Sequence, residues 1–201
     1  ERRKIMAMKE LVDIIKVTGY GEGLDVYTGT GYKLTISDLI RLHLRKTAKY
    51  TIEGPLIMGA RIAGITDPLW DLRAYGSLVG IAFQLHDDVI GLFGTEKEIG
   101  KPPKSDVNEG KQTLLMIVAM RNSDEKDREF IWKTLRSGNV SDADFEKLKK
   151  IVVESGSLDY SRWIINRFIE RGKYYLSRVD GDREVKDFLN WFADFLVSRK
   201  S

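Results

Sequence analysis

The sequence predicts an all-α protein built as a helical bundle, and three observations lead to this class. In most segments apolar residues recur at steps of three and four positions, as in amphipathic helices. No segment shows the strict two-residue alternation of a half-buried strand, and capping residues, glycines and prolines separate the helical segments. Residues 1–201 are enough for one sizeable core, so we expect a single domain.

The first helix is expected over residues 3–17, where the apolar spacing is helical. It should end or kink at the glycine cluster 19–23, because glycine favours helix ends and turns, and a loop should follow. Thr35 or Ser37 can cap the next helix, which runs toward a kink or break at Pro55.

The middle of the chain should hold the helix around which the rest is organised. Residues 54–65 are small and apolar, which predicts a helix buried on most sides. Residues 66–68 then start the organising helix, with Pro68 at its first helical position. An irregular loop is expected over 94–110, and helix resumes at Lys111. Further helices are expected over 127–135, 141–153, 158–179 and 183–199, and the pattern Ser-Asp-Ala-Asp that begins at Ser141 predicts a cap for the second of these.

Bulk composition narrows the function classes. The chain has 33 basic and 30 acidic residues, so its net charge of +3 predicts no nucleic-acid partner and no anionic membrane surface. The longest uncharged run, between Arg73 and Asp87, is shorter than the roughly 20 residues of a membrane span. Cysteine is absent, which fits a reducing, cytoplasmic setting. The first residue is Glu1 and no signal-peptide pattern follows, so we expect the chain to begin within a longer protein.

Asp87 and Asp88 are the most informative pair of charges. Two acids at a helix end can be a solvated surface, but these are flanked by apolar residues such as Phe83 and Val89. A charge in such surroundings needs a partner. Mg²⁺, which is bound by one or two carboxylates and completed by water and substrate phosphate, is the partner that this pattern indicates.

Glycine and lysine residues around this pair suggest a bound anion. Gly76 and Gly80 precede Gln84 by two turns and one turn, and either a packed helix or a ligand chain would need such glycines. Lys101 stands before two prolines, and Lys111 begins a predicted helix, where a cation is unfavourable unless an anion is near. The pair Lys46 and Thr47 can be a solvated helix face.

These residues resemble the second aspartate-rich region of the trans-isoprenyl diphosphate synthases. The matching positions are Gly80, Phe83, Gln84, Asp87, Asp88, Gly100, Lys101, Pro102, Ser105, Asp106, Glu109, Gly110, Lys111 and Thr113. Lys46-Thr47 resembles the family's Lys-Thr pair, and Gly21-Glu22-x-x-Asp25 resembles its Gly-Gln-x-x-Asp segment. Residues 157–160 and the basic end 199–200 are similar to the tail of geranylgeranyl-forming members.

The resemblance implies the C-terminal portion of an isoprenoid-synthase-type helical bundle that is usually homodimeric. It implies Mg²⁺-dependent head-to-tail prenyl transfer, in which isopentenyl diphosphate condenses with an allylic prenyl diphosphate to give a farnesyl- or geranylgeranyl-type product. The roles that it implies are metal binding by Asp87 and Asp88, contact of Phe83 and Gln84 with the reacting chain, contact of Lys46, Lys101 and Lys111 with the allylic diphosphate, and a place for Thr47 near the reaction centre.

Three departures from the family pattern matter. Gly91 replaces the last aspartate of the motif, and Glu22 stands where glutamine is commoner. Asp-Asp occurs only at Asp87 and Asp88, so the family's first aspartate-rich motif is not in these residues. We therefore expect either a C-terminal part of a longer synthase or a shortened subunit that needs a partner, and no turnover by the isolated chain.

Two rival functions follow from the same residues. One is a non-catalytic or regulatory helical subunit of a heteromeric prenyl synthase, which would not need the lysines and aspartates described above. The other is a related all-α terpene cyclase, whose usual second metal motif is not seen after Asp88.

Overall fold

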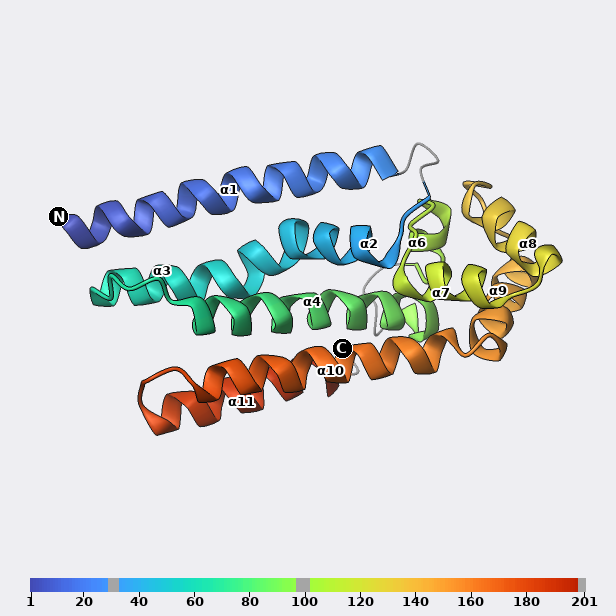
Figure 1. Ribbon diagram of the computed structural model, residues 1–201. Coiled ribbons are helices and arrows are strands. Elements are labelled where there is room, and N and C mark those ends of the chain that lie inside the picture. The colour runs from blue at the N-terminus through green and yellow to red at the C-terminus, as the bar shows by residue number, and fades with distance from the viewer. Residues whose placement is uncertain (29–32, 97–101, 199–201) are drawn as a thin grey trace. The chain divides into compact units, whose positions relative to one another are not determined.

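The computed structural model describes residues 1–28, 33–96 and 102–198 of the chain (Figure 1). Every regular element in these ranges is a helix, which confirms the all-α prediction. The chain divides into two compact units. Of the described residues, unit 1 comprises 1–25, 40–84 and 166–198, and unit 2 comprises 26–28, 33–39, 85–96 and 102–165.

Helix α1 (Arg2–Thr28), which belongs to unit 1 as far as Asp25, passes through the glycine cluster without a break. The predicted helix end at residues 19–23 is therefore wrong. Gly21 packs against helix η1 (Leu44–Glu53) so closely that a Cβ there would lie 2.5 Å from the backbone nitrogen of Lys46. Gly21 therefore allows α1 and η1 to approach closely, and it does not end a helix.

Helix α2 (Ile36–His43), the π-helix η1 and helix α3 (Gly54–Ala63) follow one another without a break. Thr35 is the cap of α2, because its Oγ accepts a hydrogen bond from the Asp38 nitrogen at 3.1 Å. Pro55 lies in the first turn of α3 and does not interrupt the helix. The preceding turn is a π turn, in which the Gly54 nitrogen donates to the Lys49 carbonyl, five residues back.

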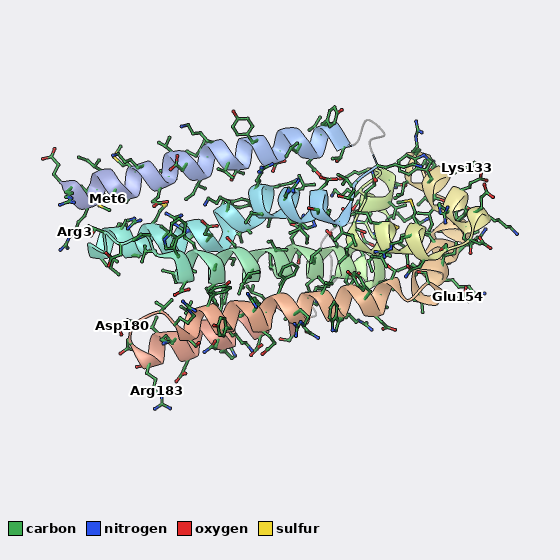
Figure 2. The ribbon with its side chains drawn as sticks, in the orientation of Figure 1. Arg3, Met6, Lys133, Glu154, Asp180 and Arg183 are labelled. Atoms are coloured by element: carbon green, nitrogen blue, oxygen red, sulfur yellow. The ribbon has the colours of Figure 1, made fainter. Side chains whose placement is uncertain are left out.

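Helix α3 is more exposed than the sequence predicts. Its buried residues, Gly54, Ile57 and Arg61, lie on one face, whereas Ile62 on the other face is 58% exposed. The Arg61 guanidinium on the buried face is 3.3 Å from the Glu10 carboxylate of α1. Gly64 ends α3 in a left-handed conformation, with the Arg3 guanidinium beside it (Figure 2). The apolar composition of this segment thus reflects small side chains rather than burial on all sides.

Helix α4 (Trp70–Phe93) is the predicted organising helix. It does not begin at Pro68, because Leu69 lies between them with a φ of 59°, which is outside the right-handed helical region. Its part in unit 1, to Gln84, contains the fully buried residues Tyr75 and Val79.

Two C-terminal helices complete unit 1 beside α4. Helix α10 (Ser157–Ser177) enters the unit at Asn166 and is followed by α11 (Arg183–Ser198), with Asp180 and Arg183 marking the connection in Figure 2. The Tyr75 hydroxyl of α4 donates to the Leu189 carbonyl of α11 at 2.6 Å. Within this unit Figure 1 shows α1, then η1 and α3, then α4, then α10 and α11, in succession across the bundle.

Unit 2 is built around α7 (Leu114–Asn122), whose residues 114–119 are all buried. Helices α8 (Glu125–Leu135) and α9 (Asp142–Glu154) pack against α7 and against each other, and the short α6 (Ser105–Asn108) contacts α8. The predicted loop over residues 94–110 therefore includes one helical turn. The Ser141 hydroxyl caps α9 by accepting from the Asp144 nitrogen at 3.1 Å, as its sequence pattern predicts.

None of the helices in the described ranges combines the length and apolar composition that crossing a bilayer requires.

Candidate active site

Thr47 on η1 and Gln84 on α4 meet directly in unit 1. The Thr47 hydroxyl, on a residue that is only 5% exposed, donates a hydrogen bond to the Gln84 Oε1 at 2.8 Å. The sequence singles out both residues, although they are 37 positions apart. The structure thus brings together two predicted site residues from separate helices.

Gly76 and Gly80 explain how these two helices come so close. A Cβ at Gly76 would lie 2.6 Å from the Glu53 Cα, and one at Gly80 would lie 2.6 Å from the Ala48 Cα. Real side chains do not tolerate such distances, so glycine at both positions lets the α4 backbone rest on η1. Of the two interpretations that the sequence leaves open, helix packing is therefore correct.

Lys46 lies beside Thr47 but is not a freely solvated cation. Its ammonium group forms an ion pair with the Asp25 carboxylate of α1 and lies 3.3 Å from the Glu22 carboxylate. Burial lowers the pKa of Lys46, but the hydrogen bonds and charges of Asp25 and Glu22 outweigh it, so the pKa is raised overall. Lys46 is therefore a cation held by two carboxylates.

Glu22 and Asp25 receive no role from sequence reasoning, although the Gly-Glu-x-x-Asp pattern is visible. Their spacing of three residues puts two side chains on one face of a helix. That signal is hidden because the glycine cluster around them predicts a helix end.

Asp87 and Asp88 lie on the part of α4 that belongs to unit 2, near the end of that helix. Asp87 is half-buried, and Asp88 is 8% exposed. Phe83, which stands one turn before Asp87, is also half-buried. The interpretation of these acids as a solvated helix end therefore does not apply to Asp88. The described residues contain no group of three or more His, Cys, Asp or Glu side chains that could hold a metal ion.

Lys111 is held by two acids of unit 2. Its ammonium group lies 2.6 Å from the Asp106 carboxylate and 2.9 Å from the Glu109 carboxylate. Burial lowers the pKa of Lys111, but hydrogen bonds to these two acids raise it well above its usual range. Lys111 does not begin a helix as predicted, because α7 starts at Leu114.

Asp106 also gives a physical reason for one departure from the family pattern. A Cβ at Gly91 would lie 2.6 Å from the Asp106 Oδ2. A side chain at position 91 would therefore meet the carboxylate that holds Lys111. In the sequence Asp106 lies among several lysines, and that spacing alone gives Asp106 no role. The predicted contact residue Lys101 lies outside the described residues.

Comparison with known proteins identifies the family. The family model described as polyprenyl synthetase matches residues 2–152. The chain belongs to the polyprenyl synthetase family. Among its relatives, geranylfarnesyl diphosphate synthase of Aeropyrum pernix is 32% identical over 96% of the chain, and geranylgeranyl diphosphate synthase of Methanosarcina mazei is 33% identical over 90% of it. The chain spans 60% and 53% of the lengths of these two relatives.

Solved structures of the family have the same fold. A geranylgeranyl pyrophosphate synthase from Corynebacterium glutamicum, complexed with isoprenyl diphosphate and magnesium, superposes with a TM-score of 0.90 and 29% identity. A polyprenyl synthase from Caulobacter crescentus, complexed with calcium and isoprenyl diphosphate, superposes with a TM-score of 0.88 and 28% identity. These matches cover 99% and 97% of this chain, and 57% and 59% of theirs. The predicted isoprenoid-synthase-type bundle is confirmed.

Proposed function

We propose that this chain forms part of a short-chain prenyl synthase that condenses isopentenyl diphosphate with an allylic prenyl diphosphate, giving a farnesyl- or geranylgeranyl-type product. The observation that carries the proposal is the hydrogen bond from Thr47 to Gln84, next to Lys46 on η1. The proton of the Thr47 hydroxyl is committed to Gln84, so the lone pairs of its oxygen remain for a positive centre. An allylic cation is such a centre.

The lysines would bind the leaving diphosphate in this proposal. Lys46 and Lys111 are each paired with two carboxylates, so a substrate diphosphate would exchange with those acids as their anionic partner. Lysine is charged at neutral pH, and burial does not neutralise either side chain, because the pKa of each is raised overall. Lys101 would take part in the same contact. Phe83 would pack against the apolar prenyl chain and help to exclude water from the cation.

Asp87 and Asp88 fit a magnesium ion by their chemistry. They offer two adjacent carboxylates, one half-buried and one buried, and Mg²⁺ is commonly bound by one or two carboxylates with water and substrate phosphate. A bound Mg²⁺ would neutralise charge on the departing diphosphate.

We propose that the 201-residue chain alone does not catalyse prenyl transfer. It contains one Asp-Asp pair, whereas the family pattern has two aspartate-rich motifs. Homodimerisation and a cytoplasmic location remain part of the proposal, the first by family resemblance and the second from the cysteine-free composition.

The test is prenyl transfer by the product of the full reading frame. Radiolabelled isopentenyl diphosphate, an allylic diphosphate and MgCl₂ should yield a longer labelled prenyl diphosphate. Asp87→Asn should lose this activity and also bind Mg²⁺ more weakly by calorimetry, whereas Asp187→Asn, at an exposed acid of α11, should behave as wild type. A wild-type rate in Asp87→Asn would contradict the assignment of Asp87 as a Mg²⁺ ligand. Turnover by the 201-residue chain alone would overturn the proposed incompleteness.

A further inference from the structure

Glu53, the last residue of η1, is a buried carboxylate to which the proposed reaction gives no role. Its side chain is only 4% exposed. It forms an ion pair with Lys49 of its own helix, accepts a hydrogen bond from the Ser77 hydroxyl at 2.6 Å and accepts another from the Arg73 guanidinium at 3.2 Å. Two of these three donors come from α4.

A carboxylate so deeply buried is tolerated only when its charge and hydrogen-bonding capacity are met. Moving η1 along α4 would take Glu53 away from Ser77 and Arg73 and leave its charge poorly compensated. The pairing thus favours one position of η1 against α4. Arg73 also forms an ion pair with the Glu10 carboxylate of α1, at 2.5 Å.

The contacts between η1 and α4 form one antiparallel register within unit 1. Glu53 meets Gly76 and Ser77, Ala48 meets Gly80, and Thr47 meets Gln84. The two glycines let the backbones approach but offer no polar side chain to fix their position along the helix axis. Glu53 supplies that group at one end of the register, and the hydrogen bond between Thr47 and Gln84 lies at the other.

The π-helical winding of η1 makes such an anchor necessary. A π-helix is rare and is usually short, and the wider turn places its side chains differently from those of an α-helix. η1 begins and ends within continuous helix, so its own capping does not fix its register. The contacts to Glu53 are at the end where α-helical winding returns.

We infer that Glu53 is a positioning residue, which fixes the register of η1 against α4 and thereby holds the Thr47 hydroxyl on Gln84. Its effect on catalysis rests on the proposed function, but its effect on the geometry of Thr47 and Gln84 does not. The two consequences are measured separately.

The geometric consequence is tested by NMR of the Gln84 side-chain amide in the 201-residue chain. Thr47→Val removes the donor to Gln84 and should shift this resonance. Glu53→Ala should shift it in the same direction, although the contacts of residue 53 on α4 lie about two helical turns from Gln84. Ser77→Ala, a milder change that removes one donor, should give a smaller shift.

Glu10→Ala is the matched control. Glu10 belongs to the same ionic network, but its ion pairs are with Arg61 of α3 and Arg73 of α4 rather than with a residue of η1. This variant should leave the Gln84 resonance in place.

The catalytic consequence is tested with the full reading frame, well below the melting temperature of each variant. Glu53→Ala should lower kcat by about 10-fold to 10²-fold, since a displacement on the order of 1 Å at a reacting group has such effects. The KM for the diphosphates should change little, and Glu10→Ala should keep the wild-type kcat.

The outcomes separate the two claims. If the wild-type protein transfers no prenyl group, the proposed function fails, and the NMR result alone decides the inference. If neither Glu53→Ala nor Ser77→Ala shifts the Gln84 amide, the inference is overturned. It is overturned as well if Glu10→Ala shifts the amide as much as Glu53→Ala does. If Glu53→Ala does not fold, the Ser77→Ala spectrum decides the inference in its place.

Discussion

Replacing Gly80 by alanine tests the contact between α4 and η1 on which the candidate site depends. The added Cβ would lie 2.6 Å from the Cα of Ala48 and 2.6 Å from its Cβ. Non-bonded carbon atoms rest about 3.5 to 4.0 Å apart, so the two helices must separate by about 1 Å. Both conflicting partners are atoms of a helix backbone and its first side-chain carbon, so no flexible side chain can move aside.

The magnitude follows from two opposing contributions. Forcing an extra methyl group into a packed interface costs about 1 to 3 kcal/mol. Alanine is favoured over glycine in a helix interior by about 1 kcal/mol, which offsets part of that cost. Gly80→Ala should therefore lower the free energy of unfolding by about 0 to 2 kcal/mol.

Gly59→Ala is the matched control. Gly59 lies inside α3, is exposed and has no neighbouring atom within 4 Å of where an added Cβ would stand, so only the helix preference applies. This variant should gain about 0.5 to 1 kcal/mol. Urea denaturation followed by circular dichroism measures both variants. The reasoning is refuted if Gly80→Ala is as stable as Gly59→Ala, because the difference between them isolates the clash.

Three further predictions use other contacts. Because the folded pKa of Lys111 lies above its unfolded value, its ion pairs should stabilise the fold fully below about pH 10.4 and lose this contribution at higher pH, as the folded state deprotonates. The stability advantage of wild type over Lys111→Met should therefore be constant from about pH 6 to about pH 9, where lysine stays charged, and a fall within that range would contradict the assignment. Ser157→Ala should lower the free energy of unfolding, measured by urea denaturation, by about 1 to 2 kcal/mol, because the fully buried hydroxyl donates to the Leu115 carbonyl at 2.6 Å. Ser177→Ala, which removes an exposed hydroxyl, should cause no measurable loss of stability. Thr47→Val should shift the Gln84 side-chain amide in NMR spectra, and an unchanged spectrum would argue against the 2.8 Å hydrogen bond.

Most of the fold is predictable because local rules decide it. Thr35 and Ser141 cap their helices as their sequence patterns indicate, and α4 covers the predicted organising segment. The errors arise where a distant contact overrides a local preference. Gly21 sits inside α1 because η1 rests against it, and no property of residues 19–23 alone reveals that.

The candidate site is predictable by residue type but not by pairing. Thr47 and Gln84 follow from the family resemblance, yet their direct hydrogen bond depends on how closely α4 approaches η1. The pairing of Lys46 with Asp25 and of Lys111 with Asp106 is not predictable, because an acid on a polar surface looks the same in the sequence whether or not a lysine reaches it. The π-helical winding of η1 has no signature in its sequence that would separate it from an α-helix.

Prenyl transfer by the product of the full reading frame is the measurement that tests the central claim most directly. With Mg²⁺, isopentenyl diphosphate and an allylic diphosphate, the wild-type protein should release a longer prenyl diphosphate, and Asp87→Asn with Asp88→Asn should abolish it. Absence of any prenyl product from the wild-type protein, or an unchanged rate in the double variant, would contradict the account.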